Sequence, residues 1–257
     1  MKVLTGTPPQ LARWAADRVL HRLRTRSLSV LGVATGSSPL PVYRALAASG
    51  EPALASLRVF ALDEYVGLPH HHPQSYHCVV DREVTRPLGL DPARVHVPDG
   101  AADDLDAAAA EYEHLIAASG GIDLQVLGIG ANGHVGFNEP FSSLRSRTRV
   151  ETLTARTRRD NARFFGGDLQ QVPTSCLTQG LGTILDADEV VLIATGAAKA
   201  HAVAQMVEGP LSSACPASVL QLHPRATVLL DDRAAAQLTR RDDHEQAGAA
   251  TGPPRNP

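Results

Sequence analysis

The residues best suited to catalysis lie in the stretch GIGANGHVGFNEP, residues 128–140. It carries Asn132, His134 and Glu139, and an imidazole with a carboxylate five residues away can act as an acid–base group near neutral pH. The alternative is a histidine that is satisfied structurally within a loop, which is the commoner case for any single histidine. Convergence with other reactive turns favours the catalytic interpretation.

The glycines of this stretch fit a G-x-G-x-x-G pattern at Gly128, Gly130 and Gly133. A dinucleotide site also requires a helix that opens at the third glycine, so that its amides meet the pyrophosphate. Here Gly136 and Pro140 follow within seven residues and make a poor helix. The pattern therefore does not predict a dinucleotide site, and the sequence has no Gly-Lys-Ser/Thr of a Walker loop.

Two adjacent carboxylates, Asp63 and Glu64, follow the apolar run VFAL of residues 59–62. Buried carboxylates are costly unless they are solvated or used. A general base at the mouth of a sheet and a helix cap or surface turn explain this pair equally well.

Two turns that combine hydroxyls with glycine indicate an anion site. One is Thr35-Gly36-Ser37-Ser38-Pro39 and the other is Thr195-Gly196-Ala197-Ala198-Lys199. Free N–H groups at a helix start bind phosphate, and a bound anion would favour Lys199 where the helix dipole alone disfavours a cation. A capped turn and a solvated lysine are the alternatives, but two such turns favour one phosphate site.

A basic segment follows the glycine loop. Its arginines are Arg145, Arg147, Arg149, Arg156, Arg158, Arg159 and Arg163. They fit a solvated helix face, but the chain has a formal net charge of −3, and guanidinium binds phosphate oxygens in bidentate fashion. We therefore expect at least one of them to recognise an anion.

Strands and helices must alternate to position these turns. Strands are predicted at 28–33, 57–62, 122–129, 189–194 and 226–230, and helices at 11–23, 39–48, 103–119 and 197–207. This order predicts a single-domain α/β protein, with an open Rossmann-like, mostly parallel sheet and helices on both faces. Ligands then bind beyond the carboxyl ends of the strands. The domain is expected to span residues 1–235, with a disordered tail over 236–257.

Composition narrows the remaining options. The 257 residues are 43% hydrophobic and 20% charged, which is ordinary for a globular protein. The net charge gives no reason to expect a nucleic acid or an anionic membrane as partner. No signal peptide or membrane span is visible, so a cytoplasmic location is expected. Three distant cysteines predict no disulfide framework or zinc site. The three consecutive histidines at residues 70–72 are expected to form a surface turn and not a metal site.

Together with DEYVGLP (63–69), the stretch GHVGFNEP (133–140) resembles the glucosamine-6-phosphate deaminases of the glucosamine/galactosamine-6-phosphate isomerase family. The resemblance covers about residues 1–235 and rests on LGVATGSSPLPVYRAL (31–46), ALDEYVGLP (61–69), HPQSYH (72–77), GIGANGHVGFNEP with SSLRSRTRV (128–150), NARFFGG (161–167), the stretch 172–200 and the stretch 207–231. The pair DEYVGLP and GHVGFNEP is highly specific.

The resemblance implies hydrolytic conversion of glucosamine 6-phosphate to fructose 6-phosphate and ammonia, a step of N-acetylglucosamine catabolism, without metal or organic cofactor and in a homo-oligomer. It implies that Asp63 is the general base, that His134 assists ring opening and that Glu139 is its partner. The implied phosphate contacts are Thr35, Gly36, Ser37, Ser38, Arg163 and Lys199.

The chain departs from the family pattern at Asn132 and at Glu151. Asn132 stands where some relatives have aspartate, and an amide cannot stabilise an imidazolium as a carboxylate does. Ser142, Ser143 and Arg149 match part of an allosteric site for N-acetylglucosamine 6-phosphate, but Glu151 stands where a lysine would, so we expect weak or absent activation. The alternative functions are a galactosamine-6-phosphate deaminase, a 6-phosphogluconolactonase and a non-catalytic sugar-phosphate sensor. The DEYVG match argues against the lactonase, because a lactonase needs no base at C2 of its substrate.

Overall fold

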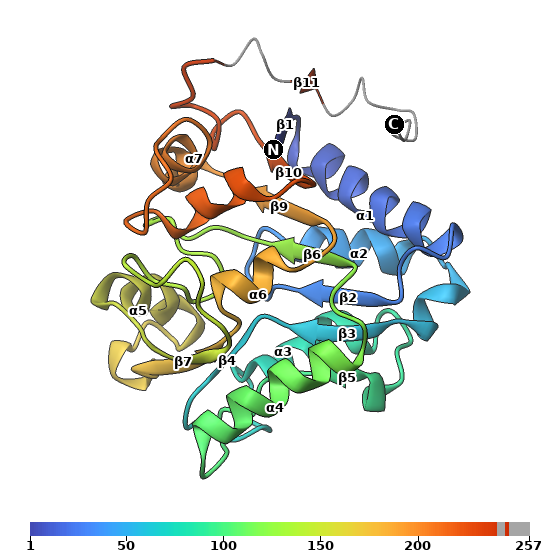
Figure 1. Cartoon of the computed structure of the whole chain (residues 1–257), viewed down its shortest axis with the longest axis vertical. Coiled ribbons are helices and arrows are strands. Elements are labelled where there is room, and N and C mark those ends of the chain that lie inside the picture. The colour runs from blue at the N-terminus through green and yellow to red at the C-terminus, as the bar shows by residue number, and fades with distance from the viewer. Residues whose placement is uncertain (241–244, 247–257) are drawn as a thin grey trace.

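The computed structural model describes residues 1–240 and 245–246, so most of the predicted tail, residues 241–244 and 247–257, lies outside the described residues. The main sheet has the strand order β11-β1-β10-β9-β6-β2-β3-β5, and all its pairings are parallel (Figure 1). Its strands are β1 (Lys2–Thr5), β2 (Val30–Val33), β3 (Arg58–Ala61), β5 (Val95–His96), β6 (Leu124–Leu127), β9 (Val190–Ala194), β10 (Ala226–Leu230) and β11 (Glu245–Gln246).

Helices cover both faces of this sheet. They are α1 (Pro8–Arg24), α2 (Leu40–Ala48), α3 (Tyr76–Val80), α4 (Leu105–Ala118), α5 (Ala155–Asn161), α6 (Leu181–Leu185) and α7 (Ala200–Val207). One buried cluster joins the sheet to α1 and α2, and another joins the opposite face to α4, α6 and α7. The predicted single-domain, Rossmann-like fold is therefore confirmed.

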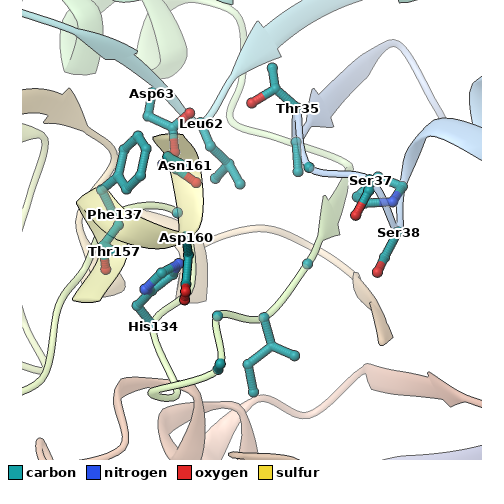
Figure 2. Close-up of a pocket in the computed structure, with 18 of the residues that line it drawn as sticks. Thr35, Ser37, Ser38, Leu62, Asp63, His134, Phe137, Thr157, Asp160 and Asn161 are labelled. Carbon is teal, nitrogen blue, oxygen red and sulfur yellow. The ribbon is translucent and has the colours of Figure 1, made fainter. Parts of the chain in front are cut away.

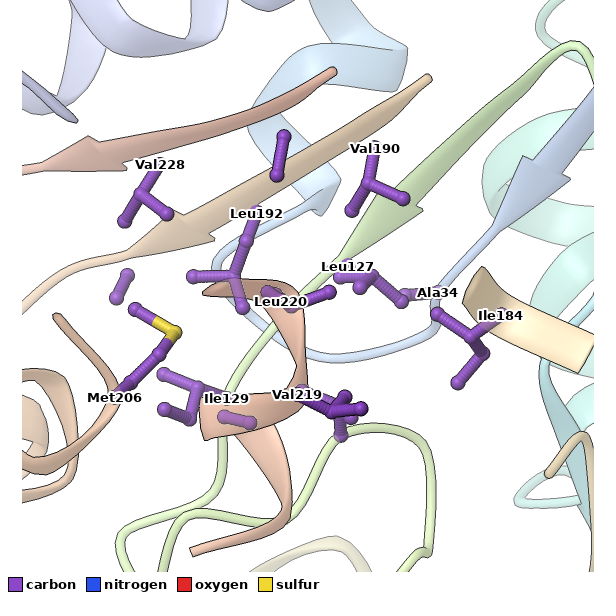
Figure 3. Packing of buried hydrophobic residues seen from close by; sticks show 14 of the residues in the cluster. Ala34, Leu127, Ile129, Ile184, Val190, Leu192, Met206, Val219, Leu220 and Val228 are labelled. Carbon is purple, nitrogen blue, oxygen red and sulfur yellow. The ribbon is translucent and has the colours of Figure 1, made fainter. Parts of the chain in front are cut away.

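The central strands β2, β6, β9 and β10 are buried on both sides because their side chains alternate between the two clusters. In β10, Val228 and Leu230 belong to one cluster while Leu229 belongs to the other. Figure 3 shows Val228 and Leu192 of the sheet facing the layer that contains Met206. A strand buried on both faces reads as a continuous apolar run, which is why the sequence revealed these strands.

A second sheet was not predicted. It is antiparallel, with the order β4-β8-β7, and consists of β4 (Asp63–Tyr65), β8 (Ser175–Thr178) and β7 (Arg149–Thr152). Figure 1 shows β4, β7 and α5 together at the left of the view, beside the main sheet. The chain thus leaves β3 and enters a different sheet at Asp63. The surface-turn alternative for Asp63 and Glu64 is wrong, because both residues are buried in a strand.

A buried ion-pair network holds α1 to the amino-terminal ends of two strands. These ends lie opposite the carboxyl ends that carry the turns. Arg18 Nε and Nη2 donate to the two carboxylate oxygens of Glu189 at 2.7 and 2.8 Å, and Arg22 Nη1 lies 3.3 Å from Glu189 Oε2. Arg22 Nη1 also donates to the Asp123 carbonyl at 2.5 Å. The network therefore ties helix α1 to the segments that open β6 and β9.

Replacing Glu189 with glutamine is expected to lower the free energy of unfolding by about 3 kcal/mol, because two guanidinium groups lose a buried partner. Urea denaturation at neutral pH measures this change. The control is Glu51→Gln, which removes an ion pair with the exposed Arg24 and should cost under about 1 kcal/mol. Equal losses for the two variants would show that burial does not strengthen the Glu189 network.

Candidate active site

One pocket of about 140 Å³ collects the turns that follow several strands (Figure 2). Its lining is Ala34, Thr35, Gly36, Ser37, Ser38, Pro39, Leu62, Asp63, Tyr76, Gly128, Ile129, Gly130, Ala131, His134, Gly136, Phe137, Thr157, Asp160, Asn161, Arg163, Phe164 and Lys199. The pocket thus brings together the predicted hydroxyl turn, the predicted base, the histidine and two of the predicted cations. Asn132 and Glu139 lie behind the histidine, outside this lining.

The two hydroxyl-glycine turns meet at one end of the pocket. Ser38 Oγ lies 3.3 Å from Thr195 Oγ1, so side chains from the turns before α2 and α7 touch directly. The amide of Gly196 donates to both carboxylate oxygens of Asp231, at 3.0 and 3.1 Å, which fixes the second turn. Burial and the charge of Arg163 lower the pKa of Lys199. A bound anion would relieve this strain between neighbouring positive charges.

Asp63 presents a carboxylate from a buried strand into the pocket. Its residue is only 5% exposed, and burial, together with the neighbouring Glu64, raises its pKa to about 8. The glycine loop comes close to it, since a Cβ at Gly136 would lie 3.6 Å from Asp63 Oδ2. A carboxylate with this pKa is a far stronger base than an aspartate in water.

Glu64 faces the other way and has a structural role. Its carboxylate accepts the backbone N–H groups of Tyr65, Tyr76 and His77, each at 2.8 Å. Two of these donors belong to the first turn of α3, so Glu64 holds that helix start against β4. The helix-cap explanation of the acidic pair therefore holds for Glu64, while Asp63 is the residue that lines the pocket and its role as a base stays a prediction.

Gly130 of the glycine loop makes room for the imidazole. A Cβ at Gly130 would lie 2.3–2.5 Å from three atoms of the His134 ring, so any other residue would overlap the ring. The Gly130 amide donates to the His134 carbonyl at 2.8 Å, and Gly133 adopts a positive φ of 88° in the turn between them. The loop is irregular, as predicted, and of its three patterned glycines Gly130 is the one that lies against the histidine ring, while Gly133 lies against Cys215.

Glu139 lies behind the imidazole and is held by several donors. Its Oε2 lies 3.6 Å from His134 Nδ1 and accepts Asn132 Nδ2 at 2.7 Å, while its Oε1 accepts the Thr154 amide and hydroxyl at 3.0 and 3.1 Å. Burial alone would raise its pKa, but His134 and the donors of Thr154 and Thr157 outweigh burial and lower the pKa to about 2. Glu139 is therefore a fixed negative charge behind the ring.

The basic segment does not form one anion site. Arg163 lines the pocket, with its guanidinium 4.7 Å above the Phe164 ring. Arg158 donates to the carbonyls of Leu169 and Val172 and so closes the loop after α5. Arg147 pairs with Asp186. Of the seven arginines, Arg163 is the one that lines the pocket, and its recognition of an anion stays a prediction.

The residues that match an allosteric site lie outside the pocket. Arg149 donates to Glu151 and, at 3.0 Å, to Ser142 Oγ, and Ser142 Oγ in turn donates to Glu151 Oε2 at 2.9 Å. Ser143 is exposed, and its hydroxyl accepts the Arg145 amide at 3.3 Å. The carboxylate of Glu151 thus occupies donors that a phosphate would need.

Several lining residues were missed by the sequence analysis. Tyr76, Thr157, Asp160 and Asn161 line the pocket, and three of them come from α5, which was not predicted. The available signal was Thr154, whose hydroxyl accepts the Thr157 amide at 3.2 Å and caps α5. A single capping threonine before a polar stretch is a weak signal.

The remaining features of the described residues can be stated briefly. No described helix is both long and apolar enough to cross a bilayer. No group of three or more His, Cys, Asp or Glu in the described part of the chain is placed to hold a metal. The run at residues 70–72 lies in a surface turn, in which His70 Nε2 lies 3.0 Å from Asp99 Oδ1.

Sheet, turns and pocket define the class of Rossmann-like α/β proteins that bind their ligand beyond the strand ends. The model of the family "Glucosamine-6-phosphate isomerases/6-phosphogluconolactonase" matches residues 7–229. The chain belongs to this family, and the resemblance found in the sequence is confirmed.

Known relatives carry a narrower name. The glucosamine-6-phosphate deaminase of Cutibacterium acnes is 59% identical, with 93% of each chain covered, and that of Streptomyces coelicolor is 58% identical, with 87% of each covered. Among solved structures, a monomeric glucosamine-6-phosphate deaminase superposes with a TM-score of 0.88 at 40% identity, covering 92% of this chain and 99% of the other. A 6-phosphogluconolactonase from Trypanosoma cruzi shares the fold, with a TM-score of 0.75 at 20% identity and coverage of 93% and 97%.

Proposed function

We propose that this chain converts glucosamine 6-phosphate and water to fructose 6-phosphate and ammonia, with residues 1–235 as the catalytic unit. The observation that carries the proposal is the pocket, which is lined by Asp63, His134, the hydroxyl turn Thr35 to Ser38 and Lys199. The relatives named glucosamine-6-phosphate deaminase support the substrate.

The phosphate would bind at the end where Ser38 and Thr195 meet, with Lys199 and Arg163 as its cations. Hydroxyls, helix-start amides and a guanidinium are the usual partners of a phosphate dianion. Binding at this remote end supplies the free energy that positions the reacting carbons.

Ring opening requires a proton to move between the ring oxygen and the anomeric hydroxyl. His134 is suited to this transfer because its ring lines the pocket while Glu139 stays charged behind Nδ1 and stabilises the imidazolium form. Asn132 leaves the charge of Glu139 unchanged, but its side-chain amide donates to Oε2, the same oxygen that lies near His134 Nδ1.

Asp63 would then take the proton from C2 of the open-chain aldehyde, which gives an enolamine. Return of a proton to C1 leaves a C2 iminium, and water adds to it and expels ammonia to give the ketone. One water is consumed and no electrons are exchanged with another molecule. The base needs a pKa near the working pH, and the raised pKa of Asp63 meets that requirement.

The decisive experiment incubates the purified protein with glucosamine 6-phosphate, galactosamine 6-phosphate and 6-phosphogluconolactone, and follows ammonia and ketose phosphate. Release of both products from glucosamine 6-phosphate is expected. Faster release from galactosamine 6-phosphate would favour that deaminase instead. Binding of both amino sugars without turnover would favour a sensor.

Replacing Lys199 with methionine is expected to raise KM for glucosamine 6-phosphate about 30-fold with little change in kcat, because a phosphate loses a charge-assisted contact remote from the reaction. Steady-state kinetics measures both constants. Arg145→Gln is the control, since it removes an exposed positive charge outside the pocket lining. An unchanged KM in Lys199→Met would remove this lysine from the phosphate site.

We also infer weak or absent activation by N-acetylglucosamine 6-phosphate, because Glu151 engages Ser142 and Arg149. Rates at substrate concentrations below KM, with and without this compound, should agree within about twofold. Activation of tenfold or more would contradict the inference.

A homo-oligomer remains a proposal from the family resemblance, and a cytoplasmic location remains a proposal from the sequence analysis. Size-exclusion chromatography with light scattering measures the number of subunits. A monomer would match the structural relative described as monomeric.

A further inference from the structure

One charged group of the pocket has no role in the reaction described above. Asp160 is an exposed residue of α5 that lines the pocket, and within the described residues its carboxylate has no hydrogen bond or ion pair, although its charge partly offsets the lowering of the Lys199 pKa. Figure 2 shows it beside His134, across the view from Ser37 and Ser38. An unpaired carboxylate in a pocket that must accept a phosphate would weaken binding unless the ligand also carries a positive group.

The charges of the pocket match a zwitterion. Asp63 and Asp160 are the carboxylates of the lining, and Arg163 and Lys199 its permanent cations. Because the pKa of Asp63 is raised to about 8, Asp63 is mostly uncharged at neutral pH before substrate binds. Within the described residues Asp160 acts electrostatically on Lys199, which a bound phosphate would engage. Asp160 is then the carboxylate of the lining that can face a ligand cation, and glucosamine 6-phosphate carries an ammonium at C2, the carbon on which Asp63 would act.

We propose that Asp160 recognises the ammonium group of the substrate and so selects amino sugar phosphates over neutral hexose phosphates. This inference rests on the proposed function. Asp160 is a specificity residue and takes no part in moving the C2 proton. Its position on α5, next to Asn161 and three residues before Arg163, places it on the same segment that supplies a phosphate contact.

Two open-chain analogues that cannot react test the proposal by calorimetry: 2-amino-2-deoxyglucitol 6-phosphate and glucitol 6-phosphate, which differ only in the group at C2. The unsubstituted protein should bind the amine analogue more tightly. Asp160→Asn should weaken the amine analogue about fivefold, the scale of a partly exposed charge pair, and leave the neutral analogue within about twofold. Asp160→Glu should restore part of the preference.

Asp168→Asn is the matched control, because it removes the same charge from an exposed residue outside the pocket. Two results would overturn the inference and leave the proposed function standing. One is that Asp160→Asn weakens the binding of both analogues equally. The other is that the preference for the amine analogue is lost in Asp63→Asn and kept in Asp160→Asn. Binding of neither analogue by the unsubstituted protein would overturn the proposed function and this inference with it.

Discussion

Asp63→Asn is expected to lower kcat by about 10³-fold while the substrate still binds, because an amide cannot accept the C2 proton and general-base catalysis is worth about 10²–10⁴ in rate. The substitution keeps the size of the side chain, so the phosphate end of the pocket should be intact. Kinetics of ammonia release gives kcat, and calorimetry with 2-amino-2-deoxyglucitol 6-phosphate gives binding.

The pH dependence offers an independent check on Asp63. The carboxylate form is the active base and its pKa is raised to about 8, so kcat/KM should rise with pH up to about 8. A profile that is flat between pH 6 and 9 would show that the free protein has a base of lower pKa.

The same raised pKa predicts an effect on stability. The folded protein binds a proton at Asp63 that the unfolded chain releases at a pKa of about 4, so this residue makes unfolding easier as pH rises from about 4 to about 8. Asp63→Asn should therefore raise Tm at pH 8 relative to the unsubstituted protein and change it little at pH 4. A lower Tm at pH 8 would indicate that the carboxylate stabilises the fold.

The second large effect is expected at Glu139. Glu139→Gln should lower kcat about 10²-fold, because the imidazolium formed at His134 loses the buried charge 3.6 Å from Nδ1. The amide also brings an NH₂ group toward either Asn132 or Thr154, both of which donate, so the free energy of unfolding should fall by about 2 kcal/mol. Steady-state kinetics and urea denaturation separate the two effects.

Glu113→Gln is the matched control for Glu139. The Glu113 carboxylate likewise accepts a backbone amide and two hydroxyls, from Thr148 and Thr183, but it lies outside the pocket lining. It should lose stability on a similar scale and keep its kcat. If both variants lose kcat equally, the effect of Glu139→Gln reflects general loosening of the fold.

Much of the site could be predicted because strand ends of a parallel sheet converge. Apolar runs such as residues 30–33 located the strands. The residues that follow these strands then had to lie together beyond the carboxyl ends of the sheet, and they include Thr35 to Ser38, His134 and Lys199. The glycine loop was excluded as a dinucleotide site from Gly136 and Pro140 alone, and its irregular backbone agrees. The physical basis in each case is local, within a few residues of a strand.

The second sheet could not be predicted because its strands are short and distant in the sequence. Asp63 pairs with Thr178, and Thr178 with Arg149, so no local pattern reveals the pairing. The burial of Asp63, and hence its raised pKa, depends on that sheet. Helix α5 escaped for a different reason, since ARTRRDN is polar on every side and has no apolar stripe.

The contact between Gly130 and the ring of His134 gives position 130 an importance that its chemistry would not suggest. A single added methyl group would push the imidazole out of its seat, although glycine itself carries nothing that reacts. The proposed role of His134 therefore requires the absence of a side chain at position 130, and a survey of functional groups alone would overlook it.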